Sequence, residues 1–191
     1  MRERILGGAV LVLVLAGALL FWQTRRARLE PPAVLAQIKR LNQLATVRYS
    51  IQRIVGIKEE KQPLGSESIL LIVQARVDAG INLDLMRPQD VTVGKDGSIT
   101  VQLPPPTILD VSIDEKNTKV WDRQKTWWTP WVPYSLDLEQ RARIAGLEGA
   151  RQAALDMGIL RNADQNARDS VRVLLELAGA KSVVVVSPTS M

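Results

Sequence analysis

Acidic side chains recur through the middle of this chain, and they are the residues whose chemistry could support catalysis. They are Asp78, Asp84, Asp110, Asp114 and Asp122. Two carboxylates held close together can exchange a proton with a substrate or bind a divalent cation. Their spacing matches neither a calcium-binding loop nor a phosphate-binding loop. Solvated strand faces and loop starts usually account for such aspartates, so an Asp-based metal-dependent or acid–base hydrolase is the alternative hypothesis rather than the first.

The sequence contains no histidine and no cysteine, which removes most other routes to catalysis. Thiol nucleophiles, Ser-His-Asp triads and cysteine-rich zinc sites each require one of these side chains. We therefore assign no catalytic residue, no metal ligand and no cofactor from the sequence.

Four of the five tryptophans of the chain lie between positions 121 and 131, in the segment VWDRQKTWWTPWVPY. Trp and Tyr side chains are frequent at protein interfaces and at membrane surfaces, so this segment predicts a binding surface. Its residues are Trp127, Trp128, Trp131 and Tyr134. Burial of the same rings in a loop that covers a sheet is the competing hypothesis. Trp121 follows a strand-like stretch, so we expect its side chain in the core. Neighbouring side chains on extended backbone point to opposite faces, so we expect at least one of Trp127 and Trp128 to be exposed.

The positive charge of the chain is concentrated beside its N-terminus, although the overall pI is about 9.8. The chain has 25 basic and 20 acidic side chains, and residues 1–28 hold five of the basic and one of the acidic ones. The remaining residues therefore carry 20 positive and 19 negative charges, which nearly cancel. A nearly neutral domain without a dense Lys/Arg stripe argues against nucleic-acid binding. The basic residues instead flank an apolar segment, where Lys and Arg meet anionic lipid head groups.

Residues 5–22 form an apolar run of 18 residues without a charge, which predicts a membrane-spanning helix. Crossing about 30 Å of hydrocarbon takes roughly 17–25 such residues. Trp22 ends the run where aromatic rings settle at the head groups, and Arg25, Arg26 and Arg28 lie just outside. A cleaved signal peptide is the alternative, but the bulky end of the run does not resemble a signal-peptidase site. We therefore predict a retained single-pass anchor in the cell membrane. The count of Lys and Arg favours a cytoplasmic domain, whereas the four-residue tail before the anchor favours an exported one, so the side of the domain stays open.

The rest of the chain shows the periodicities of strands and helices. Apolar residues at helical spacing over residues 34–44, after two prolines, predict a short amphipathic helix. A period of two, interrupted by turn residues, predicts several strands. These cover residues 47–52, 69–82, 91–93, 98–103, 109–113 and 182–186. Two longer helices are predicted over residues 137–157, opened by a capping box of Asp137 and Gln140, and over residues 161–177. The apolar face of the second is predicted to consist of Ala163, Ala167, Val171, Leu174 and Leu177.

Strands followed by two helices and a returning strand predict an α+β fold. We expect an N-terminal transmembrane helix, then a mixed or antiparallel sheet with two C-terminal helices packed on one face and a final, buried returning strand. The corresponding division is a transmembrane anchor with basic flanks (1–28), a linker and amphipathic helix (29–45), and an α+β domain (46–191).

Several stretches of the domain resemble the bacterial domain of unknown function 4230 family. The most specific are AGINLDL (79–85) and LPPPTILDV (103–111), and the likeness extends over most of residues 44–186. The resemblance implies a membrane-anchored protein with no assigned reaction. It therefore carries no catalytic residue over to this chain.

Together these features predict a non-enzymatic, single-pass membrane-anchored domain of the bacterial envelope that acts in binding or assembly. The expected partners are the lipid bilayer and either another protein or a second copy of the chain; nucleic acid is not among them. Aspartates clustered in a pocket would favour the enzyme hypothesis, whereas an exposed apolar patch would favour binding.

Overall fold

The structure is a computed structural model that describes residues 31–40, 43–61, 65–126 and 134–188. Its helices are α2 (Pro31–Lys39), α3 (Leu138–Asp156) and α4 (Ile159–Leu177). Its strands are β1 (Gln43–Glu60), β2 (Ser66–Asn82), β3 (Val91–Val93), β4 (Ser98–Gln102), β5 (Thr107–Ile113), β6 (Lys119–Lys125) and β7 (Ser182–Val186). Two short 3-10 helices, Leu83–Leu85 and Pro88–Asp90, separate β2 from β3.

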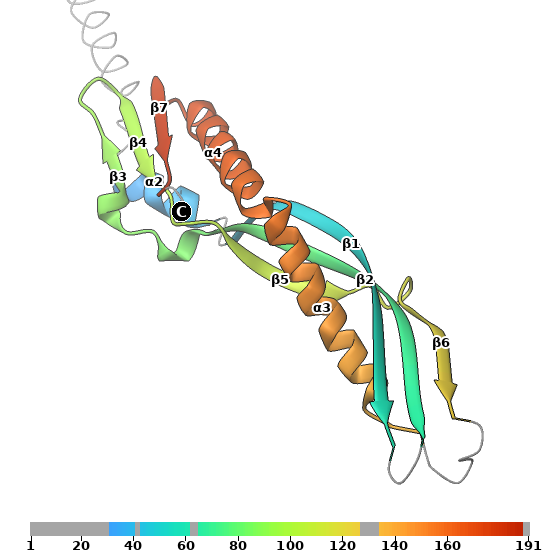
Figure 1. The fold of residues 1–191 in the computed structure, drawn as a ribbon. Coiled ribbons are helices and arrows are strands. Elements are labelled where there is room, and N and C mark those ends of the chain that lie inside the picture. The colour runs from blue at the N-terminus through green and yellow to red at the C-terminus, as the bar shows by residue number, and fades with distance from the viewer. Residues whose placement is uncertain (1–30, 41–42, 62–64, 127–133, 189–191) are drawn as a thin grey trace, which may run out of the picture.

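A long antiparallel hairpin, formed by β1 and β2, runs through most of the molecule (Figure 1). The two strands pair from Gln43 opposite Asn82 to Glu60 opposite Ser66. β2 has 17 residues. At about 3.4 Å per residue such a strand extends over roughly 58 Å, so strand length alone makes the molecule elongated.

Strands β5 and β6 lie end to end along the other edge of β2 and complete a four-stranded antiparallel sheet, sheet A. β5 pairs with the C-terminal part of β2, and β6 pairs with its N-terminal part. The turn between them is held to β2 at Gln74. Its carbonyl oxygen accepts the Asp114 N–H at 2.7 Å, and its own N–H donates to the Thr118 hydroxyl at 3.0 Å. β2 is thus the central strand of sheet A.

Helices α3 and α4 follow each other along one face of sheet A (Figure 1). Each helix has 19 residues. At 1.5 Å per residue the two together extend over roughly 57 Å, which matches the length of the hairpin. The chain turns from one helix to the next at Gly158, whose φ of +77° is a left-handed conformation that favours glycine.

The buried face of both helices is a stripe of residues at every fourth position, a spacing that keeps side chains on one side of a helix. The stripe consists of Leu138, Ala142, Gly146, Ala150 and Ala154 in α3 and of Ile159, Ala163, Ala167, Val171 and Leu175 in α4. It packs against the alternate buried residues of β2. The approach is close at Gly146, where an added Cβ would lie 2.6 Å from Val73 Cγ2.

A second, three-stranded sheet lies at one end of the molecule, where β3, β4 and β7 adjoin α2 (Figure 1). β3 pairs with β4 in antiparallel orientation, whereas β7 pairs with β4 in parallel orientation, so this sheet is mixed. Val34, Leu35 and Ile38 of α2 are buried in one core with this sheet and with the C-terminal half of α4.

The predicted α+β class, the two C-terminal helices on one sheet face and the returning final strand are confirmed. The sequence pattern did not predict β6 or the division into two sheets. The hairpin strands are also longer than predicted, and Leu44 belongs to β1, because the first helix ends at Lys39.

Three predicted details are wrong. The final strand is not buried: β7 is an edge strand, of whose residues only Val185 is buried and Val183 is half-buried. Leu177 is 83% exposed, and Leu175 takes the core position because the buried stripe repeats every four residues. The capping box does not form, since the Asp137 side chain makes no hydrogen bond to the helix backbone. Its carboxylate instead lies 3.1 Å from Arg141 Nε.

The predicted membrane anchor lies outside the described residues, and so do Trp22, Arg25, Arg26 and Arg28. Among the helices that the structure describes, none combines the length and the hydropathy needed to cross a bilayer. The anchor therefore stays a prediction.

Replacing Gly146 by alanine should destabilise the fold by about 1–2 kcal/mol. Overpacking a core costs about 1–3 kcal/mol, and the better helix propensity of alanine offsets only about 1 kcal/mol of this. Gly149→Ala is the matched control in the same helix, because the nearest atom there, Arg53 Nε at 3.3 Å, belongs to a flexible side chain. In urea unfolding followed by circular dichroism, the control should be at least as stable as the parent. Equal losses in the two variants would contradict the close approach at Gly146.

Candidate functional site

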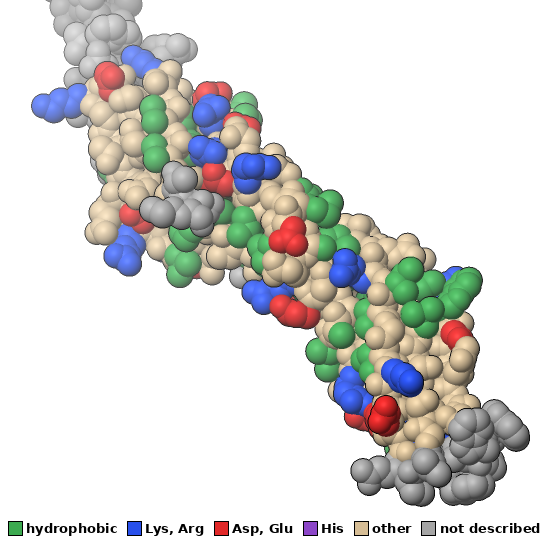
Figure 2. Space-filling model, in the orientation of Figure 1, with side chains coloured by type: hydrophobic (Ala, Val, Ile, Leu, Met, Phe, Trp, Pro, Cys, Tyr) green, Lys and Arg blue, Asp and Glu red, His purple; other side chains and the backbone are tan. Residues whose placement is uncertain are grey.

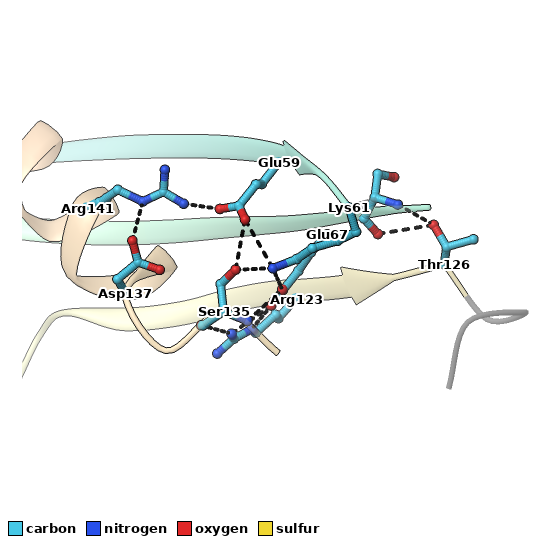
Figure 3. A network of polar contacts seen from close by, with 9 residues as sticks. Glu59, Lys61, Glu67, Arg123, Thr126, Ser135, Asp137 and Arg141 are labelled. Carbon is cyan, nitrogen blue, oxygen red and sulfur yellow. Dashed lines mark hydrogen bonds and ion pairs between the residues drawn. The ribbon is translucent and has the colours of Figure 1, made fainter. Parts of the chain in front are cut away.

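Polar side chains from four parts of the chain meet where the hairpin turns from β1 to β2 (Figure 3). They come from the end of β1, the start of β2, the end of β6 and the segment that leads into α3. The set, here named the hairpin-end network, consists of Glu59, Lys61, Glu67, Arg123, Thr126, Ser135, Asp137 and Arg141. It lies at the opposite end of the molecule from α2 and the second sheet (Figure 1).

Glu67 is the centre of the hairpin-end network, and its side chain is fully buried. It occupies a core-facing position of β2, two residues before the buried Ile69. Its Oε1 accepts hydrogen bonds from Arg123 Nε at 2.9 Å and Nη2 at 2.7 Å, and its Oε2 accepts the Ser135 backbone N–H at 2.8 Å. Lys61 Nζ lies 3.4 Å from the same Oε2. These donors compensate for the loss of water around a buried carboxylate.

The pKa of Glu67 reflects two opposing effects. Burial raises it, because a charged carboxylate is penalised in the interior. The hydrogen bond from the Ser135 N–H and the Arg123 guanidinium outweigh burial and hold the pKa below its ordinary value of 4.5. Glu67 is therefore ionised at neutral pH.

Glu59 joins the end of β1 to the start of α3. Its carboxylate accepts hydrogen bonds of 3.1 Å from Lys61 Nζ and from Ser135 Oγ, and it forms an ion pair with Arg141. The hydrogen bonds from Lys61 and Ser135 lower the pKa of Glu59. Because Arg141 also pairs with Asp137, the first turn of α3 is held to the hairpin by charge.

Ser135 and Lys61 are in contact, as the nucleophile and base of a serine–lysine hydrolase would be. A lysine serves as general base only when its pKa is lowered, so that its amine is neutral. Here the hydrogen bond to Glu59, together with Glu67, raises the pKa of Lys61 and keeps its ammonium charged. Lys61 therefore cannot take the proton of Ser135, and the contact fits a structural brace.

The same network holds both flanks of residues 127–133. Before this segment, the Thr126 hydroxyl accepts the Ser66 N–H at 2.7 Å, which holds the end of β6 to the start of β2. After it, the Ser135 carbonyl oxygen accepts a hydrogen bond of 2.7 Å from Arg123 Nη2. The described residues on either side of 127–133 are thus both held to the hairpin end.

Two aromatic residues beside this segment are described, and both are exposed. Trp121 is 64% exposed and Tyr134 is 53% exposed. The centroid of the Tyr134 ring lies 4.8 Å from the Arg123 guanidinium carbon and 5.1 Å from Lys125 Nζ. Lys119 Nζ lies 5.7 Å from the centroid of the Trp121 ring. These cation–π contacts orient the rings and leave them accessible to solvent.

The prediction that Trp121 lies in the core is wrong. The register between β2 and β6 shifts at Leu70 and Leu71, whose partners are Asp122 and Val120. Trp121 is the extra residue of this bulge, so it has no partner on β2. The bulge interrupts the alternation of side chains along β6, which would otherwise place Trp121 on the core face of the sheet. Val120 is 40% exposed. Figure 2 shows apolar side chains gathered on the surface near the start of β6.

The remaining predicted binding residues, Trp127, Trp128 and Trp131, lie outside the described residues, so their exposure stays a prediction. Tyr134, the fourth, is exposed as a binding residue must be. Leu136, close to it in sequence, is 99% exposed and was not predicted from the sequence.

The five aspartates do not gather into one site. Asp78 and Asp110 lie opposite each other on β2 and β5. Asp78 accepts two hydrogen bonds from Arg48, at 2.6 and 2.7 Å, and these lower its pKa. Asp114 holds the turn after β5, where it accepts the Lys116 N–H. The other two, Asp84 and Asp122, lie in the first 3-10 helix and in β6. Within the described part of the chain, no group of three acidic side chains could hold a metal ion.

Glu67 and Arg123 were not predicted as a pair. A signal for Glu67 was present, because the alternation that buries Ile69 extends two residues back and places Glu67 on the core face. No local signal pointed to Arg123, which lies 56 positions further along the chain.

Comparison with known proteins gives one family match. Residues 36–185 match the family described as protein of unknown function (DUF4230), a range that extends from α2 into β7. No curated protein and no solved structure matches the chain.

Glu67→Gln should lower the free energy of unfolding by about 3 kcal/mol at neutral pH. The amide keeps the shape of the side chain but leaves Arg123 without its countercharge and Lys61 with Glu59 alone. Removing one partner of a buried ion pair costs about 3–5 kcal/mol. Glu148→Gln is the matched control, because Glu148 is exposed on α3 and belongs neither to the hairpin-end network nor to the edge of β1. It should change the free energy by less than about 0.5 kcal/mol. Similar effects of both variants in urea unfolding would show that the buried carboxylate does not hold the hairpin end.

The stability difference between the parent and Glu67→Gln should depend on pH. The pKa of Glu67 in the folded state lies below its ordinary value of 4.5. The contribution of its charge to the free energy of unfolding is therefore complete above about pH 4.5. The contribution is lost as the pH falls through the lower, folded-state pKa. Unfolding measured across this range should show a constant difference between about pH 5 and 7 that narrows in more acidic buffer. A difference that already narrows above about pH 5 would mean that the pKa is raised instead.

Proposed function

The chain belongs to the DUF4230 family of proteins of unknown function, and from that premise we propose that it is a membrane-anchored, non-enzymatic binding domain of the bacterial envelope. The proposed binding surface is the aromatic end, which comprises Trp121, Tyr134 and Leu136 together with the three tryptophans of residues 127–133. The exposure of two large aromatic side chains beside the ion pair that Arg123 forms with the fully buried Glu67 is the observation that carries this proposal.

Exposed aromatic and aliphatic side chains support a binding role. Trp and Tyr are enriched among the residues that contribute most to protein–protein affinity, and clustered apolar side chains on a surface mark interaction sites. Trp121 and Tyr134 are each more than half exposed, and Leu136 is almost wholly so. In the proposed complex these side chains are removed from water by the partner.

The hairpin-end network supports the same role by holding the surface in one arrangement. Arg123 is bound both to Glu67 and to the Ser135 carbonyl oxygen, and its guanidinium lies beside the Tyr134 ring. A surface that is already ordered loses less conformational entropy when a partner binds. The buried charges therefore contribute to recognition by positioning the aromatic side chains, without contacting the partner themselves.

The proposed membrane anchor is residues 5–22, with Arg25, Arg26 and Arg28 beside the lipid head groups. The chain continues from it into α2, which lies at the end of the molecule opposite to the aromatic end (Figure 1). Tethering and partner binding are thus assigned to opposite ends of one elongated body.

Membrane fractionation tests the anchor. The full-length protein should stay in the membrane pellet after washing with high salt, and deletion of residues 1–28 should release it to the supernatant. Replacing Arg25, Arg26 and Arg28 by glutamine is the control, because it removes the charge and keeps the apolar segment. This variant should stay in the pellet, since burial of an apolar span does not depend on ionic strength. Release of this glutamine variant to the supernatant would show that surface charge, and not an apolar span, holds the protein at the membrane.

Site-specific photo-cross-linking in cells tests the binding surface. A benzophenone amino acid in place of Tyr134 should give one defined protein adduct, whereas the same amino acid in place of Met157 should not. Met157 is a suitable control because it is 61% exposed and lies just after α3. Adding Trp121→Ala should reduce the adduct at position 134 while changing the free energy of unfolding by less than about 1 kcal/mol. Equal adducts at both positions, or no adduct at position 134, would contradict the proposal.

A further inference from the structure

The outer edge of β1 is a long stretch of unpaired backbone. β1 pairs with β2 and with no other described strand. Near its start, α4 covers the edge: Asn166 donates to the Thr46 carbonyl oxygen at 3.1 Å, and the Thr46 hydroxyl donates to the Ala163 carbonyl oxygen at 2.9 Å. From Arg48 to Glu60 the described chain provides this edge with no hydrogen-bonding partner. The opposite edge of sheet A is divided between β5 and β6, which have seven residues each.

The open stretch of β1 carries five charged side chains, but it lacks the prolines and bulges by which proteins also protect an edge strand from pairing. It contains no proline and a single lysine, Lys58. Its one irregularity, between Ala45 and Val47, precedes the open stretch. Ile54, at the middle of the open stretch, is 67% exposed. A regular edge with an exposed aliphatic side chain at its centre is suited to pairing with another strand.

We infer that this edge pairs with the same edge of a second copy of the chain, in antiparallel orientation and about a two-fold axis at Ile54. Each residue of β1 then lies opposite a residue of the second copy that is the same number of positions from Ile54, on the other side of it. Opposite residues share a face of the joined sheet, so the core-facing and outward-facing rows stay continuous. Ile54 meets Ile54, and Ile51 meets Ile57 of the second copy, which gives aliphatic pairs on both faces.

The charges of the edge favour this register. Arg48 lies opposite Glu60 of the second copy, and the two-fold axis repeats this pair, so two such pairs form. No two like charges lie opposite each other in this register. Arg48 already donates to Asp78 through Nε and Nη2. A guanidinium carries five N–H donors, so others remain for Glu60.

Neighbouring registers lose this complementarity. An axis at Arg53 would place Arg48 opposite Lys58 and Arg53 opposite itself, and directly opposed like charges are destabilising. An axis at Val55 would remove both pairs between Arg48 and Glu60. The register about Ile54 therefore combines opposite charges at the ends with an aliphatic pair at the centre.

This pairing extends beyond the proposed function, because the β1 edge is separate from the aromatic end. The two-fold axis is perpendicular to the sheet, so the helices of both copies cover the same face of a sheet twice as wide. Loss of partner binding at the aromatic end would leave the pairing intact, and loss of pairing would leave the aromatic end exposed.

Single cysteines test the register, because the natural chain contains none. In the full-length protein extracted in detergent, Ile54→Cys should shift from monomer to covalent dimer on a denaturing gel after treatment with a short bismaleimide. Opposite Cβ atoms in such a pair lie about 5 Å apart. Ser50→Cys alone and Lys58→Cys alone should stay monomeric, since eight residues of strand separate equal positions by about 27 Å. A mixture of these two variants should form the dimer, because positions 50 and 58 lie opposite each other.

Two further measurements complete the test. Met157→Cys reports random collision of exposed thiols and should stay monomeric. Native mass spectrometry of the unmodified protein should give the mass of two chains. The absence of a dimer from Ile54→Cys, equal cross-linking by Ser50→Cys alone, or the mass of a single chain would each overturn the inference.

Discussion

The antiparallel pairing of β1 with β2 is the contact on which every other described element depends. It creates a ladder far longer than one ordinary helix, so two helices in succession are needed to cover one face of it. β5 and β6 likewise divide the second edge of β2 between them. A slip of one residue between β1 and β2 would place β1 side chains on the wrong face along the whole hairpin. Register is therefore the constraint that the rest of the structure must satisfy.

The hairpin-end network places a buried charge at the turn end of this ladder. Glu67 lies beyond the aliphatic core that α3 forms with β2, and its partners come from β6 and from the segment before α3. A buried ion pair adds little net stability over apolar packing, but a buried charge without its partner is strongly unfavourable. A slip between β1 and β2 would move Lys61 away from Glu67, and a slip between β2 and β6 would separate Glu67 from Arg123. The network therefore disfavours the alternatives more than it stabilises the native state.

Anchoring and the inferred pairing of two copies are geometrically compatible. Antiparallel β1 strands place the α2 ends of the two copies at opposite ends of the pair. If the two-fold axis is along the membrane normal, the two α2 helices would lie at the same distance from the bilayer, and the proposed anchors of both chains could enter it. The pair would then lie along the membrane surface. The aromatic end of each copy would then lie beside the body of the other, and its exposed rings would remain available to a partner.

The α+β class, the two C-terminal helices and most of the strands could be predicted from the sequence, because these features depend on periodicities between near neighbours. A repeat of about four residues with glycine at the stops marks α3 and α4, and alternation marks β2. The apolar run over residues 5–22 likewise predicts an anchor from local composition alone. Only the tertiary structure decided which segments meet. The partner of Glu67 lies 56 positions away, β7 joins β4 rather than sheet A, and the exposure of Trp121 follows from a bulge. A local pattern states which face of its own element a residue occupies, but pairing and bulges depend on the register between strands distant in the chain, which no local pattern contains.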